Sequence, residues 1–189
     1  ILTAGHYNRK NAAPVTESST YEFQLEDIDV LYIHFVDNYK STTNSKSINT
    51  RFKSHSDSTK VNVELDKRVQ YLNSTMAKKA LNSLEYEVKI DSKHLDLNTH
   101  INSDQKIAFQ DLDVKMEVYL PENKWLIADE TTVRLLKNQF RMQNLEVDKP
   151  FKIINRKIIC EACTENIEEN NSSDSWEQEV HQSLKTLDI

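Results

Sequence analysis

Apolar and polar residues alternate most regularly along residues 112–120. Every second position there is apolar: Leu112, Val114, Met116, Val118 and Leu120. Because successive side chains of a β-strand point to opposite faces, this period predicts a strand with one face in a core. A turn at Pro121 and Asn123 follows, and then a second apolar run at 125–129, which predicts another short strand.

Several other stretches have the composition or the period of strands. Residues 28–36 carry apolar side chains on both faces, which favours a strand that is covered on both sides. Residues 61–71 alternate between apolar and polar side chains, as a half-buried strand does. The same alternation in residues 86–97, on either side of a turn at Asp91 and Ser92, predicts a hairpin. Further short apolar runs lie at 21–25, 106–109, 132–136, 151–154 and 156–160.

Residues 74–84 have the period of a helix instead. The apolar residues that fall on one helical face are Met76, Ala77, Ala80, Leu81 and Leu84. Lys78 and Lys79 point away from that face. Ser74 can accept hydrogen bonds from the free amides of the first turn, so we expect Ser74 to be the N-cap.

Short strands at close spacing indicate an all-β sandwich, barrel or solenoid. The chain has one glycine, so turn positions that need a positive φ must fall largely to Asn and Asp. A stacked β-solenoid uses Asn in this way, and so do ordinary hairpins. The residues alone therefore predict a mainly β domain and leave the choice of architecture open.

The two ends of the chain differ from its middle. Residues 1–19 are a polar lead, residues 20–163 contain the strand-like runs, and residues 164–174 are an acidic linker with few core residues. Residues 175–189 then predict an amphipathic C-terminal helix. Its apolar stripe consists of Trp176, Val180, Leu184 and Leu187. Such a stripe must be covered, either by the sheet of the same chain or by a partner chain.

Charge and composition exclude some classes of function. The formal net charge is -6, whereas binding to nucleic acid needs a concentrated basic face. No run approaches the roughly 20 apolar residues of a membrane-spanning helix, and no secretory signal is visible at the start. We therefore expect this chain, as given, to be soluble and to bind no nucleic acid.

Two groups of residues raise the question of a catalytic or metal site. His94, Asp96 and His100 share one face of a strand and could meet a metal ion, but alternation with leucines explains the same pattern. Residues 54–58 offer Ser, His and Asp together, although neighbours in one loop seldom form a triad. His34 lies within an apolar strand, where we expect a hydrogen-bonded core histidine. We therefore predict neither catalytic residues nor a metal.

Cys160 and Cys163 are the two cysteines, in the order CEAC. A single CxxC could be a redox pair, half of a zinc site or a local disulfide. Zinc would need two further ligands, and the motif follows a strand-like run rather than opening a helix, where a thiol pKa is lowered. A structural pair or two unreactive thiols is the favoured interpretation. Gly5 stands alone, which excludes glycine-rich nucleotide loops, so no cofactor is expected.

The order of these features resembles a known family. AKKALNSLEYEV at 77–88 and HLDLN at 94–98 precede FQDLDVKMEVYLPENKWLIADETT at 109–132, and KIICEAC ends the series at 163. This order is similar to the C-terminal toast-rack domain of Bacteroidetes phage-shock-protein-C (PspC) proteins. The sequence departs from the family in three ways. The small membrane-anchoring module is absent, Asn and Lys replace the usual turn glycines, and residues after 163 have no counterpart.

The resemblance implies a solenoid-like stack of short strands and a non-enzymatic role. The domain would be tethered to the inner membrane by a segment outside this chain, on a side that the sequence leaves open. It would sense envelope stress or bind protein partners of the envelope-stress system, and it could also bind a second copy of itself. An exposed apolar patch near Trp125 or under the tail helix would support this. An adhesin-like surface protein and a metal- or thiol-dependent enzyme are the alternatives.

Overall fold

The computed structural model describes residues 14–25, 28–39, 45–56, 59–70, 73–91, 93–103 and 112–163. The elements in chain order are β1 (Val15–Gln24), β2 (Val30–Val36), β3 (Ser45–Ser47), β4 (Asn49–His55), β5 (Lys60–Val69), α1 (Ser74–Asn82), β6 (Leu84–Glu85), β7 (Lys89–Asp91), β8 (His94–Asn98), β9 (His100–Ser103), β10 (Leu112–Pro121), β11 (Trp125–Ala128), α2 (Glu130–Phe140), β12 (Lys152–Ile154) and β13 (Lys157–Ile159).

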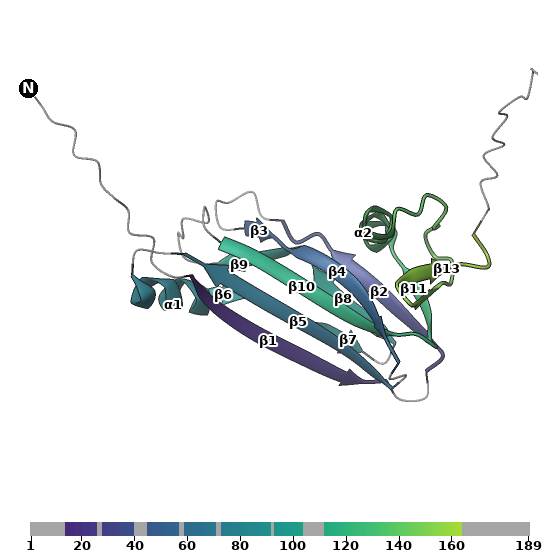
Figure 1. Cartoon of the computed structure of the whole chain (residues 1–189), viewed down its shortest axis with the longest axis horizontal. Helices are drawn as coiled ribbons and strands as arrows, with labels where there is room; N and C mark the ends of the chain where they lie inside the picture. Colours follow the sequence, from purple (N-terminus) through teal and green to yellow (C-terminus); the bar gives the residue numbers. More distant parts are fainter. Residues whose placement is uncertain are drawn as a thin grey trace, which may run out of the picture.

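Two four-stranded sheets lie against each other (Figure 1). The first has the order β1-β5-β10-β4, with the β10 and β4 pair parallel and the other pairs antiparallel. The second has the order β11-β2-β8-β7, in which β11, β2 and β8 are parallel and β7 is antiparallel to β8. The helix α1 lies at one end of the elongated molecule, and α2 lies at the other end with β11 and β13 (Figure 1).

The core lies between the two sheets. The strand β10 supplies Val114, Met116, Val118 and Leu120, all at most 1% exposed. From the second sheet, Leu31, Ile33 and Phe35 of β2 and Leu95 and Leu97 of β8 point the same way. The rings of Phe35 and Phe52 meet edge to face, with their centroids 5.8 Å apart. Because β2 and β4 belong to different sheets, this aromatic pair joins the two layers.

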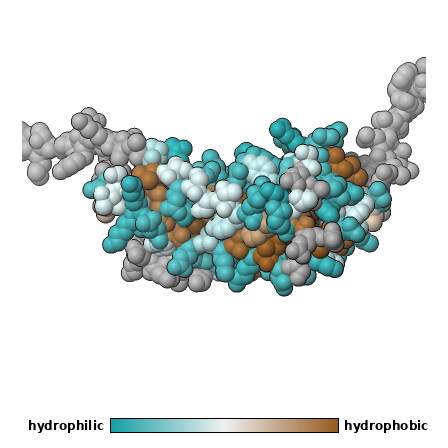
Figure 2. Space-filling view, turned by 90° about the horizontal axis from the view of Figure 1, so that it is seen from below, coloured by the Kyte–Doolittle hydropathy of each residue, from teal (hydrophilic) through white to brown (hydrophobic). Residues whose placement is uncertain are grey.

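At the underside, β1 and β7 are the edge strands of the two sheets. Five apolar side chains of these two strands and of the segment before β7, which we call the seam, are partly buried against the core: Tyr21, Phe23, Tyr86, Val88 and Ile90. Figure 2, which views the molecule from below, shows hydrophobic surface set among hydrophilic surface on this side. The seam therefore leaves apolar surface partly open to solvent.

The predicted strands at 112–120 and 125–129 are present as β10 and β11. They follow each other at once, yet they lie in different sheets. The turn at Pro121 and Asn123 therefore carries the chain from one layer to the other, and each strand buries its apolar face in the common core. The half-buried strand predicted at 61–71 is also confirmed, as β5, and β7 with β8 forms the predicted hairpin.

The prediction that residues 28–36 are covered on both sides is wrong. In β2 one face is buried, but Tyr32 is 37% exposed and Val36 is 39% exposed on the other. His34 lies on that open face and its side chain is 52% exposed, so His34 is not a core histidine. Apolar side chains on both faces of a strand can mean a second core or an interaction surface, and the sequence does not separate the two.

The apolar run at 132–136, predicted as a strand, belongs to the helix α2. Asp129 is the N-cap and accepts a hydrogen bond from the Thr132 backbone N–H at 2.9 Å. Val133 and Leu136 are buried three residues apart on one side. A run of five residues is too short for its period to distinguish helix from strand. The signal for a helix was Asp129 as a potential N-cap, followed by the acidic Glu130 in the first turn.

The helix predicted at 74–84 is present as α1, with two corrections. The N-cap is Asn73 rather than Ser74, because the Asn73 side chain accepts from the Thr75 backbone N–H. Met76 is 59% exposed, so the buried face is made by Ala77, Ala80 and Leu81 instead.

The domain extends further toward the N-terminus than predicted. The strand β1 starts at Val15, inside the predicted polar lead, and none of its side chains is fully buried. Its Ser, Thr and Glu residues suit an edge strand, which has no strong apolar alternation. The antiparallel pairing of β1, β5 and β10 fits a mainly β toast-rack domain but does not confirm the stacked coils of a solenoid. The predicted run at 106–109, the acidic linker and the C-terminal helix lie outside the described residues.

Positive φ angles among the described residues occur without glycine. Asp148 and Asn155 adopt them, as expected for a chain with a single glycine, but so do Arg141 and Arg156. Asn155 and Arg156 form the two-residue turn between β12 and β13, where both central residues need positive φ. Arginine at two left-handed positions was not predictable, because glycine or asparagine suits them better.

Candidate interaction surface

The outer face of the β11-β2-β8-β7 sheet collects the groups with the most varied chemistry. The parallel register places Tyr32 beside His94 and His34 beside Asp96. The Tyr32 and His94 rings stack with their centroids 4.9 Å apart. We name the side chains of Tyr32, His34, Val36, His94 and Asp96 the open face.

His34 joins the open face to the start of α2. Its Nδ1 lies 3.5 Å from Asp96 Oδ1, and its Nε2 lies 3.4 Å from Asp129 Oδ2. Thr132 donates its hydroxyl hydrogen to the same Asp129 side chain. The imidazole can therefore accept or donate hydrogen bonds at the boundary between sheet and helix, and it is open to solvent.

The three residues that the sequence analysis considered as metal ligands do not come together. His94 and Asp96 are in β8, whereas His100 is in β9, which pairs with β3 and β6 in a separate small sheet. The two ring nitrogens of His34 point to different carboxylates, so that cluster also lacks a common centre. Among the described residues, no group of three or more His, Cys, Asp or Glu side chains could hold a metal ion.

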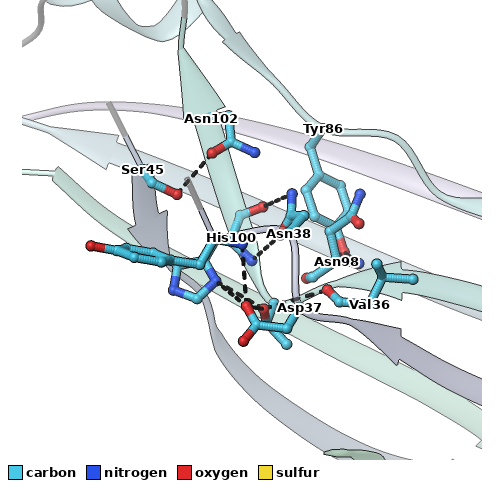
Figure 3. Close-up of polar contacts among 10 residues, drawn as sticks. Val36, Asp37, Asn38, Ser45, Tyr86, Asn98, His100 and Asn102 are labelled. Carbon is cyan, nitrogen blue, oxygen red and sulfur yellow. Dashed lines mark hydrogen bonds and ion pairs between the residues drawn. The ribbon is translucent and has the colours of Figure 1, made fainter. Parts of the chain in front are cut away.

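His100 instead takes part in a polar network that fixes the chain after β2 (Figure 3). Its Nδ1 lies 2.8 Å from Thr99 Oγ1 and 3.4 Å from Asp37 Oδ1, and Thr99 donates to Asp37 at 3.2 Å. The Tyr39 ring lies 5.3 Å from the imidazole. The Asp37 carboxylate, the Thr99 hydroxyl and the His100 imidazole are thus in contact, which are the group types of a catalytic triad. The hydroxyl is bonded to both of its neighbours, so the arrangement holds a loop rather than presenting a free nucleophile.

Three side chains form hydrogen bonds with both the backbone N–H and the backbone C=O of a residue at a strand edge. The Asn38 amide donates to His100 O and accepts from His100 N, both at 3.0 Å (Figure 3). The Gln139 amide on α2 does the same for Phe52 of β4, at 2.6 and 2.8 Å. The Tyr86 hydroxyl donates to Asn98 O and accepts from Asn98 N. Each side chain replaces the hydrogen bonds of a missing neighbouring strand.

Trp125, predicted to belong to an interaction surface, lies at the margin of the open face. It is paired with Val30 in the register, on the same side of the sheet as Tyr32. It is half-buried, and Lys152 Nζ lies 4.3 Å from the centre of its ring. The other residues predicted for such a surface, Trp176, Val180, Leu184 and Leu187, lie outside the described residues.

The remaining candidates have structural contacts. Cys160 and Cys163 are joined by a disulfide just after β13, with their Cα atoms 5.4 Å apart. In the stretch 54–58, Ser54 donates to Glu122 and the His55 ring contacts Lys60 O. These contacts point Ser54 and His55 to different partners, and Asp57 lies outside the described residues.

An ion pair with a tyrosine lies on the outer face of the other sheet. Lys53 Nζ is 2.5 Å from Glu117 Oε2, and the Tyr119 hydroxyl donates to the same oxygen at 2.8 Å. The hydrogen bond from Lys53 holds the pKa of Glu117 below its ordinary value, and the bond with Glu117 raises the pKa of Lys53. Hydrogen bonding to Glu117 also raises the pKa of Tyr119. The charged pair therefore persists over a wider pH range in the folded protein.

This ion pair predicts a loss of stability in acid. A carboxyl whose pKa is lowered by folding contributes stability above its unfolded pKa, about 4.3, and loses it as pH falls through the folded value. We expect the urea midpoint to fall between about pH 5 and pH 3, and to fall less in Glu117→Gln. Glu87→Gln, which removes a carboxylate that is 70% exposed, is the control. If the urea midpoint falls equally steeply with pH in the parent protein and in Glu117→Gln, the acid-dependent loss of stability does not come from Glu117.

The described helices are too short or too polar to cross a membrane. Among solved structures, an adhesin-like protein from Parabacteroides merdae ATCC 43184 is similar at 14% sequence identity, with a TM-score of 0.29. The similarity covers 60% of this chain and 35% of that one, so the chain spans about a third of that protein. At this TM-score the likeness supports no conclusion. No curated protein matches.

A family model gives the decisive comparison. The model of the toast-rack domain found in some PspC proteins matches residues 35–166, which is more than half of the chain. The match begins in β2 and continues past the disulfide, so it includes most of both sheets and the helix α2. The chain therefore belongs to the family of toast-rack domains found in some PspC proteins.

Proposed function

We propose that this domain is a non-enzymatic sensing and protein-interaction module of a membrane-anchored PspC-like protein in an envelope stress response. PspC-type proteins are membrane-associated, and another part of the full-length protein would supply the anchor. The observation that carries the proposal is the open face, where aromatic, aliphatic and ionisable side chains stand together on a sheet.

The open face suits a protein partner for physical reasons. Tyr32 and Val36 offer apolar area at more than a third exposure, and aromatic residues are enriched in the centres of protein interfaces. His34 and Asp96 add hydrogen-bonding groups that fix the orientation of a partner. A sheet face also keeps these groups at fixed positions, so little side-chain order must be gained on binding.

The alternatives have weaker support. For the adhesin-like alternative, the likeness to a solved adhesin-like structure has too low a TM-score to be used. For a metal- or thiol-dependent enzyme, His94 and His100 belong to different sheets, and Cys160 and Cys163 are bonded to each other. We therefore keep the proposal that the open face binds a protein of the envelope-stress system or a second copy of the chain.

A photo-crosslinking amino acid placed at Val36 of the full-length protein, in its native cells, tests the proposal. We expect a discrete protein adduct under envelope stress, because Val36 projects from the open face. The control position is Thr20, which is exposed on β1 of the other sheet. Equal adducts at both positions, or none at Val36 with normal expression, would refute the open face as the interaction surface.

A further inference from the structure

A groove runs along α2 to the β12–β13 hairpin. It consists of two hollows of about 450 and 430 Å³ that share Met142 and Gln143. The first hollow is lined along α2 and includes Val133 and Val147, and the second reaches the hairpin at Ile158. Val147 is 41% exposed. The floor of this groove, which we name the α2 groove, therefore presents apolar side chains to solvent.

The rim of the α2 groove is basic. Five cationic side chains line it, against the single acid Glu130: Arg134, Lys137, Arg141, Arg156 and Lys157. None of the five has an ion-pair partner within the part of the chain that the structure describes. Arg141 and Arg156 also have positive φ, where glycine would remove the steric cost. Arginine therefore adds positive charge at two positions where the backbone alone would favour glycine.

The acidic charge that would complement this rim lies in one segment. Residues 164–189 contain seven Asp or Glu and one Lys, which is a net charge of -6. The whole chain also has a net charge of -6, so residues 1–163 are balanced. The predicted helix 175–189 further carries the apolar stripe that sequence analysis left without a defined cover.

We propose that residues 175–189 of the same chain bind the α2 groove. Trp176, Val180, Leu184 and Leu187 would cover its apolar floor. The three acidic residues of 175–189, which are Glu177, Glu179 and Asp188, would face the basic rim, and the four acidic residues of the linker 164–174 would add to the attraction. This proposal uses a different surface from the open face and does not rest on the proposed function.

The position of Cys163 favours binding within one chain. The described chain ends there, after the hairpin that forms one wall of the groove, and the disulfide fixes this exit. The linker 164–174 has eleven residues, which can span roughly 36–40 Å when extended. A helix of fifteen residues is about 22 Å long and matches the scale of α2 and its neighbouring hairpin. A short linker gives an effective concentration on the order of mM, which favours the tail of the same chain over that of a second copy.

Fluorescence of Trp176 tests the proposal. Trp125→Phe leaves Trp176 as the single tryptophan, because the chain contains two. We expect its emission to be blue-shifted and protected from acrylamide, relative to a peptide of residues 164–189. Arg134→Glu with Lys137→Glu should shift the emission to that of the free peptide. Lys78→Glu with Lys79→Glu on α1, at the opposite end, is a matched change of charge that should have no effect (Figure 1).

A double variant in the tail controls for the possibility that the α2 substitutions misfold the groove itself. Val180→Asp with Leu184→Asp lies in the tail, leaves residues 14–163 unchanged and should also shift Trp176 to the free-peptide emission. Parent emission that already equals that of the peptide would overturn the proposal. Equal red shifts from the α1 and α2 charge reversals would do the same. A dimeric mass by light scattering, with a blue shift that weakens on dilution, would assign the groove to the tail of a second copy instead.

Discussion

Replacing Phe35 with alanine is expected to lower the free energy of unfolding by about 3–5 kcal/mol, the range for a buried phenylalanine. Phe35 is 1% exposed, and its ring packs against Phe52 of the opposite sheet. Alanine removes the contact between the layers and leaves a cavity that the paired strands cannot close. Urea denaturation followed by circular dichroism measures the change.

Val36→Ala is the matched control for Phe35→Ala. The two residues are neighbours in β2, but Val36 is 39% exposed on the open face. We expect a change within about 0.5 kcal/mol, as for a surface substitution. A loss at Val36 as large as that at Phe35 would mean that both faces of β2 are covered in solution. Such a result would restore the sequence-based prediction for residues 28–36.

Replacing Tyr86 with phenylalanine is expected to cost about 1–3 kcal/mol, although the ring stays in place. The Tyr86 hydroxyl satisfies both the N–H and the C=O of Asn98, at 3.0 and 3.1 Å. Without it, two backbone groups next to the seam lose their partner. Tyr39→Phe is the control, because Tyr39 is 60% exposed. Equal stability of Tyr86→Phe and the parent protein would show that water replaces the hydroxyl.

The pH dependence of the same variant gives a second test. Burial raises the pKa of the Tyr86 hydroxyl above its ordinary value. A group whose pKa is raised by folding contributes stability below its unfolded pKa, about 10, and loses it as pH rises toward the folded value. The parent protein should therefore lose stability above about pH 10, and Tyr86→Phe should lose less.

The long strands were predictable because alternation reports a buried face directly. In β10 the apolar positions point into one core, and the same is true of β5. The family was also predictable, since the family model matches residues 35–166, which contain both of these strands. The edge strand β1 gave a weak signal because its side chains are half-buried or exposed throughout.

The helix α2 and the candidate site depended on contacts distant in sequence. His34 meets Asp129, and Gln139 meets Phe52, only after two sheets and a helix have packed. Local period could not separate a second buried face of β2 from an exposed one, because both need apolar residues. The grouping of His94, Asp96 and His100 that the sequence analysis considered does not form for a similar reason: His94 and His100 are near in sequence, but the chain changes sheet between them.

The side chains that close the strand edges have a consequence for aggregation. The exposed edge of β4 is protected by an amide on α2, not by a strand, so the protection lasts only while α2 stays docked. A local opening of α2 would uncover a pairing-competent edge beside the core. Fibril nucleation in this domain should therefore depend on the stability of one helix rather than on the stability of the whole fold.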